Sequence, residues 1–238
     1  MTTQSGRAIV GEKATEPESP ATGRVSTQGH ESLPSLSLDE IFEQLYSPYP
    51  HKVARDTSRE ERKAYGYISL SLVYGEIAFQ PFRAVFDQLK RTNIALTKPG
   101  GVFLDVGSGT GKAVFAAALA HDFDACVGIE ILDGLHAISL DVAGVRSGHV
   151  FAFVHGDALE VDWPVNPSAD LVFMNSTCFT QSLLKELTKK LSAYCKAGAV
   201  VITATHPLPD TQNFDHLRTM TVEQEAWGEA TWFVHRKK

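Results

Sequence analysis

The amino-acid sequence predicts an α/β protein with a doubly wound, mostly parallel seven-stranded sheet that ends in an antiparallel hairpin and follows a small helical N-terminal region. From residue 101 onward, short apolar runs alternate with longer segments of helical periodicity, which is the pattern of consecutive β-α-β units. Near the C-terminus, two strand-like runs, 217–226 and 230–235, are separated only by Trp227, Gly228 and Glu229, as the strands of a hairpin would be.

The N-terminal part divides into two expected regions. Residues 1–33 are rich in Thr, Ser, Gly, Glu and Pro and poor in aliphatic residues, so we expect a disordered tail. Residues 34–95 are expected to be helical, because Ser37 is a favourable N-cap and apolar residues recur at helical spacing over 79–89. Within this second region, the segment 51–65 carries charges of both signs and is expected to be partly helical.

The sheet domain is expected to occupy residues 96–238. Its short apolar runs predict strands, and its longer amphipathic or small-residue segments predict helices. The expected strands before the hairpin are 102–104, 126–129, 150–154, 170–174 and 199–203, and the expected helices are 112–121, 131–145 and 181–194.

Composition and charge argue against several classes of function. The chain has 238 residues and a formal net charge of -6. Direct binding to nucleic acid needs clustered Lys and Arg, so we expect it to be weak or absent, whereas an acidic groove attracts a basic protein. The three cysteines are scattered and form no CxxC pair, which favours reduced, buried thiols.

The sequence also predicts where the protein resides. Its N-terminus lacks the basic start and apolar run of a signal peptide. Its apolar stretches are about eight residues long, whereas a membrane span needs about 20. We therefore expect an intracellular protein of the nucleus or cytoplasm, without a membrane partner.

A glycine-rich loop at residues 107–111 follows a strand that ends near Asp105, and a helix is expected from Lys112. A P-loop would need Gly at 106 and Ser or Thr at 113, where the chain has Val106 and Ala113. A GxGxxG dinucleotide fingerprint would need Gly at position 112. An acid two residues before GxGxG instead suits the cationic amino group of a methionine moiety.

Two further acids extend this pattern to an adenosine site. Glu130 ends the second expected strand, where a carboxylate can accept hydrogen bonds from two ribose hydroxyls. Asp157, after Gly156 at the end of the third strand, can accept a hydrogen bond from an adenine amino group. Together with Asp105 they predict S-adenosyl-L-methionine as the cofactor. Methyl transfer from a sulfonium is a direct displacement, and the nine histidines show no ligand spacing, so no metal is expected.

The chain from about residue 70 to 236 resembles the Dot1-like class of lysine methyltransferases. The most specific likeness is the segment 73–79, Val-Tyr-Gly-Glu-Ile-Ala-Phe, which looks like that family's Tyr-Gly-Glu loop over the cofactor and lies at the right spacing before the glycine loop. The other similar segments are 104–109, 128–130, 156–159 with Trp163, 172–179, and the hairpin residues Trp227 and 231–233.

The resemblance implies a protein-lysine N-methyltransferase that acts by direct displacement on a histone or another lysine-containing protein. It implies that Tyr74, Gly75 and Glu76 cover the methionine end of the cofactor, and that Asn175 and Phe179 line the transfer channel. Catalytic roles are thus expected for Tyr74, Asn175 and Phe179. The expected cofactor-binding residues are Tyr74, Gly75, Glu76, Asp105, Gly107, Ser108, Gly109, Thr110, Gly111, Lys112, Glu130, Ile131, Gly156, Asp157, Ala158 and Asn175.

Two departures from the family pattern keep alternatives open. After Asn175 the family has a second Asn and an aromatic residue, whereas this chain has Ser176 and Thr177. The basic segments are limited to a mixed-charge stretch, 52–63, and the tail 235–238. The alternatives are a methyltransferase for a small molecule or a non-histone protein, a non-catalytic S-adenosylmethionine-binding module and, more distantly, a nicotinamide-dependent dehydrogenase.

Overall fold

The computed structural model describes residues 36–144, 151–163, 169–224 and 228–238, and the segment from Leu36 to Lys238 forms one compact unit. The expected disordered tail, 1–33, and Trp227 of the expected hairpin lie outside the described residues. Among the helices that are described, none is long and apolar enough to cross a membrane.

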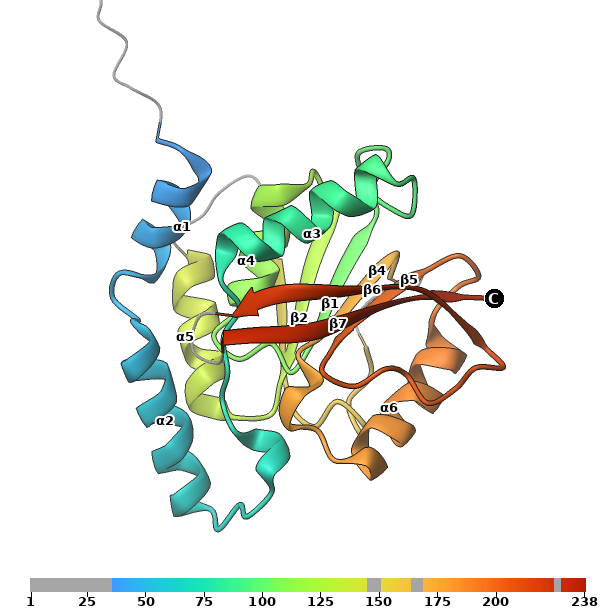
Figure 1. Cartoon of the computed structure of the whole chain (residues 1–238). Coiled ribbons are helices and arrows are strands. Elements are labelled where there is room, and N and C mark those ends of the chain that lie inside the picture. The colour runs from blue at the N-terminus through green and yellow to red at the C-terminus, as the bar shows by residue number, and fades with distance from the viewer. Residues whose placement is uncertain (1–35, 145–150, 164–168, 225–227) are drawn as a thin grey trace, which may run out of the picture. The chain divides into compact units, whose positions relative to one another are not determined.

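The described strands form one seven-stranded sheet in the order β3-β2-β1-β4-β5-β7-β6 (Figure 1). Strands β1 to β5 are parallel, β7 runs antiparallel to β5, and β6 runs antiparallel to β7. The predicted mostly parallel sheet with an antiparallel C-terminal hairpin is therefore confirmed. The strands are β1 (Val102–Val106), β2 (Ala125–Glu130), β3 (Phe151–His155), β4 (Leu171–Met174), β5 (Val200–Ala204), β6 (Phe214–Gln224) and β7 (Gly228–Lys237).

Helices cover both faces of the sheet, as the doubly wound prediction requires. In Figure 1, α3 and α4 lie on one side of the strands and α6 on the other, and α5 packs against β2 and β3. The described helices are α1 (Leu38–Tyr46), α2 (His51–Ala64), α3 (Phe79–Arg91), α4 (Lys112–Ala120), α5 (Asp133–Gly144) and α6 (Gln181–Tyr194), with 3-10 turns η1 (Leu70–Leu72) and η2 (Ser176–Cys178).

Alternate residues of the central strands enter two different hydrophobic cores. In β1, Phe103 belongs to the core that includes α3 and α4, and Leu104 belongs to the core that includes α6. In β7, Trp232 is buried in the core and the next residue, Phe233, is half-buried, as alternation along a strand requires. Because a one-residue slip would exchange the two cores, this alternation fixes the strand register and hence where each strand ends.

Helix α1 connects the N-terminal region to the glycine-rich loop. Its first turn closes with a capping box, in which Ser37 Oγ accepts from the Glu40 backbone N–H at 3.2 Å and the Glu40 carboxylate accepts from the Ser37 N–H at 2.7 Å. Phe42 stacks on Phe79 with ring centroids 4.7 Å apart. The Tyr46 hydroxyl donates to the Thr110 carbonyl at 3.1 Å, so the helix holds the loop directly.

Helix α2 is joined to the start of α5 by a single carboxylate. The two oxygens of Glu61 accept from the backbone N–H groups of Asp133 and Gly134, each at 2.8 Å. These are the first N–H groups of α5, which have no partner within their own helix. Helix α5 begins two residues later than expected, and its first intrahelical bond runs from the His136 N–H to the Leu132 carbonyl at 3.0 Å. The N–H of Leu132 itself donates to the Glu130 side chain at 2.8 Å.

Candidate functional site

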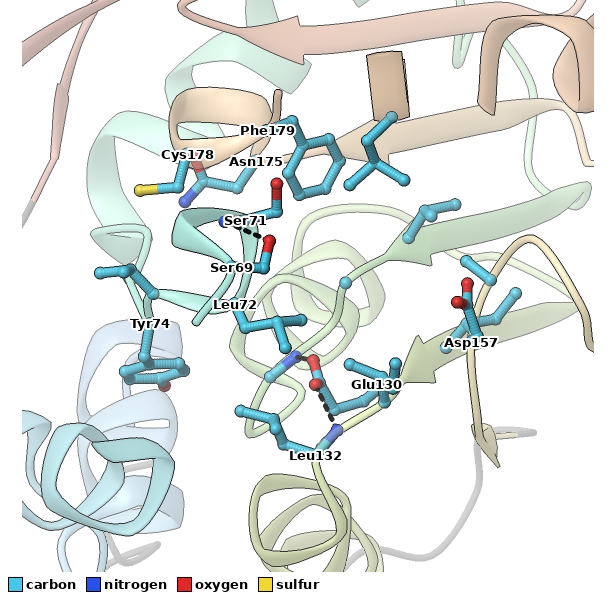
Figure 2. A pocket seen from close by; sticks show the side chains of 18 of the residues that line it. Ser69, Ser71, Leu72, Tyr74, Glu130, Leu132, Asp157, Asn175, Cys178 and Phe179 are labelled. Atoms are coloured by element: carbon cyan, nitrogen blue, oxygen red, sulfur yellow. Dashed lines mark hydrogen bonds between the residues drawn. The ribbon is translucent and has the colours of Figure 1, made fainter. Parts of the chain in front are cut away.

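The carboxyl ends of β1 to β4 open into a cavity of about 410 Å³, which is a size typical of small-molecule sites (Figure 2). Its walls combine a buried carboxylate, several hydroxyls and many apolar side chains. The lining residues are Tyr67, Ser69, Ser71, Leu72, Val73, Tyr74, Gly75, Val106, Gly107, Gly109, Ile129, Glu130, Ile131, Leu132, Leu135, Gly156, Asp157, Ala158, Asn175, Thr177, Cys178, Phe179, Thr180, Leu183 and Leu187.

The glycine-rich loop forms the floor of the cavity, and its backbone explains its sequence. Gly107, Gly109 and Gly111 have φ angles of 82°, 56° and 82°, a region that L side chains rarely adopt. A Cβ on Gly109 would lie 2.7 Å from Cε2 of Tyr74, so this position also needs glycine for close packing. Gly107 and Gly109 line the cavity and present bare backbone to it.

Glu130 is the buried carboxylate of the cavity wall. Its Oε2 accepts from the Gly109 N–H at 2.7 Å and its Oε1 from the Leu132 N–H at 2.8 Å (Figure 2), and only 6% of the residue is exposed. Burial raises the pKa of Glu130, and the two N–H donors oppose that shift. Each oxygen keeps lone-pair capacity toward the cavity, so Glu130 can accept a pair of neighbouring hydroxyls.

Asp105 lies beneath the loop rather than in the cavity wall. It is 2% exposed, and its Oδ1 has no hydrogen-bond partner among the described residues. Burial, and secondarily the Glu130 carboxylate, raise the pKa of Asp105 well above its usual value. A cation at this end of the cavity would compensate the buried charge, as the sequence-based expectation of a methionine amino group requires.

The third strand end presents Gly156, Asp157 and Ala158 to the cavity. The N–H of Gly156 donates to the Glu130 carbonyl at 2.8 Å, which ties this turn to the second strand. Asp157 Oδ1 accepts from the Leu159 N–H at 2.8 Å in a local turn. Within the described residues the second oxygen of Asp157 accepts no hydrogen bond, and Figure 2 shows this side chain at the edge of the cavity.

The Tyr-Gly-Glu segment contributes a wall and a buried network behind it. Tyr74 and Gly75 line the cavity, but the Tyr74 hydroxyl donates to Glu76 Oε1 at 2.6 Å and lies 2.9 Å from Thr110 Oγ1. Glu76 Oε2 accepts from Lys112 Nζ at 2.5 Å, and both of these charged side chains are buried. The Tyr74 hydroxyl is therefore engaged within the protein, and this segment is fastened to the first turn of α4.

Asn175 and Phe179 lie on the opposite wall, at the end of β4 and around η2. Phe179 stands close over the loop, since a Cβ on Gly107 would be 3.6 Å from its Cζ. Thr177 Oγ1 donates to Asn175 Oδ1 at 3.0 Å. The two residues that depart from the family pattern differ in placement: Thr177 lines the cavity, whereas Ser176 is fully buried and turned away.

The structure thus brings most of the sequence-predicted residues to one cavity, and places the rest behind its wall. Those that line the cavity are Tyr74, Gly75, Gly107, Gly109, Glu130, Ile131, Gly156, Asp157, Ala158, Asn175 and Phe179. Those that do not are Glu76, Asp105, Ser108, Thr110, Gly111 and Lys112. A contact with ligand remains a prediction for every residue of both groups.

Sequence reasoning missed two parts of the lining. One is the turn around η1, where Ser69, Ser71 and Leu72 reach the cavity, with only the neighbouring Tyr-Gly-Glu segment as a signal. The other is Cys178, which is half-buried in the cavity wall, whereas the sequence favoured buried thiols; Cys126 and Cys195 are buried as expected. The apolar residues of α5 and α6 that face the cavity have the same spacing as core residues, so periodicity alone does not single them out.

Several solved structures share this fold at low sequence identity. TrmN from Thermus thermophilus is 18% identical with a TM-score of 0.53, over 67% of this chain and 52% of that one. Magnesium protoporphyrin IX methyltransferase from Synechocystis PCC 6803, solved with bound SAM, is 12% identical with a TM-score of 0.51, over 87% and 100%.

Sequence comparison gives a narrower relationship. A histone-lysine N-methyltransferase of Eremothecium gossypii, H3 lysine-79 specific, is 24% identical over 167 residues. This match covers 63% of this chain but spans only 27% of the length of that relative. The sequence model of the family described as "Histone methylation protein DOT1" matches residues 49–226, which is more than half of the 238 residues. The chain therefore belongs to the DOT1 histone methylation family.

Proposed function

We propose that this protein is an S-adenosylmethionine-dependent methyltransferase that methylates a lysine side chain of a protein. The observation that carries the proposal is Glu130. It is a buried carboxylate with both oxygens oriented by backbone N–H groups, at the edge of a cavity floored by a glycine-rich loop. This arrangement suits a ribose diol, and family membership supports the choice of cofactor.

The residues around Glu130 fit the other parts of the cofactor. Ile131 and Ala158 offer apolar surface for an adenine ring, and Asp157 offers an acceptor for its amino group. The methionine end would lie toward Asp105 and Tyr74, where an ammonium group could pair with the buried Asp105 carboxyl, whose Oδ1 has no hydrogen-bond partner among the described residues. The cavity volume of about 410 Å³ is sufficient for a ligand of this class.

The protein's task in such a reaction is alignment. Bound S-adenosylmethionine supplies an electrophilic methyl group on a positively charged sulfur. Asn175 and Phe179 restrict the position of the acceptor nitrogen, which must present its lone pair to that methyl group. Apolar surroundings such as Phe179 disfavour a charged ammonium and so favour the neutral, nucleophilic form of a lysine amine.

A histone is the protein substrate we favour. The Eremothecium gossypii relative is described as specific for H3 lysine-79, and the family is described as one of histone methylation. The formal net charge of -6 is compatible with a basic protein partner. With such a substrate we expect the protein to act in the nucleus.

The decisive experiment offers the enzyme several acceptors at once. The protein is incubated with cofactor labelled in the methyl group and with nucleosomes, free histones or whole-cell extract. We expect labelled protein, with the label recovered on lysine after hydrolysis. Glu130→Ala serves as the control that abolishes transfer. Label that is found only in small molecules would contradict the lysine assignment and leave the methyltransferase assignment standing.

One observation favours a second candidate, a methyltransferase for a small polar molecule. Four serine and threonine side chains line the cavity, and an apolar tube for lysine does not require them. They are Ser69, Ser71, Thr177 and Thr180. In that case the extract assay would yield labelled metabolites and unlabelled protein.

A further inference from the structure

Two hydroxyl groups join the end of β4 to the end of β5 beside Asn175. Ser176 Oγ donates to the Ala204 carbonyl at 2.6 Å, and Ser176 is fully buried. One residue later, Thr177 Oγ1 lies 2.9 Å from Thr205 Oγ1. The segment that carries Asn175 is therefore held against the neighbouring strand by side chains as well as by the sheet.

The direction of hydrogen bonding in this group follows from counting protons. Thr177 Oγ1 donates its only proton to Asn175 Oδ1 at 3.0 Å. Its contact with Thr205 must then be one in which Thr205 donates and Thr177 accepts. The result is a relay from Thr205 through Thr177 to Asn175, whose bonds reinforce one another because each donor is polarised by the next acceptor.

Thr205 is held in an unusual backbone conformation at the start of this relay. Its φ is 68°, in the left-handed region that β-branched residues rarely adopt. Its N–H donates to the Thr231 carbonyl of β7 at 2.6 Å, which fixes the backbone there. Backbone conformations of this kind persist where the surrounding structure imposes them, and they are concentrated at functional sites.

The relay leaves one polar group of Asn175 free. Within the described residues, Asn175 Nδ2 has no hydrogen-bond partner, and it is not fully buried. In the observed arrangement Thr177 holds Oδ1, so the nitrogen is the donor that is available at the cavity. Exchange of the two amide atoms would require both hydrogen bonds of Thr177 to reverse, so that Thr177 accepts from Asn175 and donates to Thr205.

We propose that Thr177, supported by Thr205, is a positioning residue that fixes the carboxamide of Asn175, so that Nδ2 donates a hydrogen bond to an oxygen atom of the bound ligand. The inference rests on the proposed function, because that function makes the cavity a reaction site. A donor here suits an oxygen and not the acceptor amine, whose lone pair must stay free for the methyl group. That oxygen belongs either to the cofactor or to the methyl acceptor.

The test compares Thr177→Val, which keeps the side-chain shape and removes the hydroxyl, with Thr177→Ser, which keeps the hydroxyl. Thr188→Val is the matched control, because Thr188 is buried in α6 and, within the described part of the chain, its hydroxyl bonds only to the Leu184 carbonyl of its own helix. Turnover on the acceptor found in the labelling assay should fall about tenfold in Thr177→Val, the scale of one lost hydrogen bond. Thr177→Ser should restore most of it, and Thr188→Val should not change it.

A double-mutant cycle separates positioning from simple packing. In an Asn175→Ala background, Thr177→Val should cause no further loss, because its effect passes through Asn175. An equal loss in both backgrounds, or failure of Thr177→Ser to restore turnover, overturns the proposal. If cofactor affinity measured by calorimetry falls with Thr177→Val, the oxygen belongs to the cofactor. If only KM for the methyl acceptor rises, it belongs to the acceptor.

A spectroscopic measurement keeps this proposal separate from the proposed function. The side-chain amide resonances of Asn175, assigned by their loss in Asn175→Asp, should move in Thr177→Val and stay near the wild-type position in Thr177→Ser. An enzyme that transfers no methyl group would sink the proposed function and still allow this comparison. Asn175 resonances that do not respond to loss of the Thr177 hydroxyl would show that the relay does not hold the amide.

Discussion

At the scale of single residues, Asp105 links stability to binding. A buried carboxyl with an unpartnered oxygen costs free energy in the ligand-free protein, and the same group can bind a cation strongly. We expect Asp105→Asn to weaken binding of S-adenosylmethionine by roughly 1.5–3 kcal/mol, the range for a hydrogen bond to a charged group. Isothermal titration calorimetry measures this directly, and an unchanged affinity would show that the methionine end is oriented differently.

The same residue predicts a pH dependence of stability. Burial and Glu130 raise the pKa of Asp105 in the folded protein, so the folded state holds this proton more tightly than the unfolded state does. The stability that Asp105 contributes is therefore fully present below its pKa in the unfolded chain, about 3.9, and is lost as pH rises through its higher pKa in the folded protein. We expect the unfolding temperature of the ligand-free wild type to fall relative to that of Asp105→Asn over this range. If the difference in unfolding temperature between the wild type and Asp105→Asn stays constant across pH, the pKa of Asp105 is not raised in the folded protein.

At the scale of elements, the junction of α2 and α5 supports the cofactor cavity from outside. Glu61 caps the first N–H groups of α5, directly after the segment that carries Glu130 and Leu132. Removal of a helix cap typically costs about 0.5–2 kcal/mol, so Glu61→Ala should destabilise the protein by that amount. Chemical denaturation gives this value, and hydrogen exchange should quicken at residues 133 and 134 in particular. Glu61→Gln, which keeps one acceptor oxygen, should have a smaller effect.

The junction also shows which features sequence reasoning could reach. The glycine loop, the acids at strand ends and the amphipathic helices are local patterns, and each was found from a few neighbouring residues. Glu61 and Asp133 are 72 positions apart, and Thr177 and Thr205 are 28 apart, so only the folded chain brings them together. Likewise, motifs in the sequence identify Asp105 and Tyr74 as site residues. Only packing in the folded chain decides that Asp105 is buried behind the cavity wall and that the Tyr74 hydroxyl bonds to Glu76.

At the scale of the whole molecule, the cavity is assembled from distant parts of the chain. The segment around η1, the glycine loop, the start of α5 and the turn at η2 each supply a wall, and Thr180 N–H donates to Ser71 Oγ at 3.1 Å between two of them. The sheet could be predicted as a whole because both of its faces are buried, and such strands are recognisable as short apolar runs in the sequence. The division into a helical region, 34–95, and a sheet domain, 96–238, stays a prediction. Residues from both of these stretches line the cavity.

The positions of the three cysteines allow the reactivity of one thiol to report whether the cavity of the wild-type protein holds a ligand. Burial raises the pKa of all three thiols, that of Cys195 to about 12 and that of Cys126 further, but Cys178 is only half-buried and lies in the cavity wall. A small alkylating reagent should therefore modify Cys178 first, and saturation with S-adenosylmethionine should slow that reaction. Mass spectrometry of the modified peptide follows both rates, with Cys178→Ser as the blank. Ligands of the cavity can then be screened by footprinting, before any methyl acceptor is known.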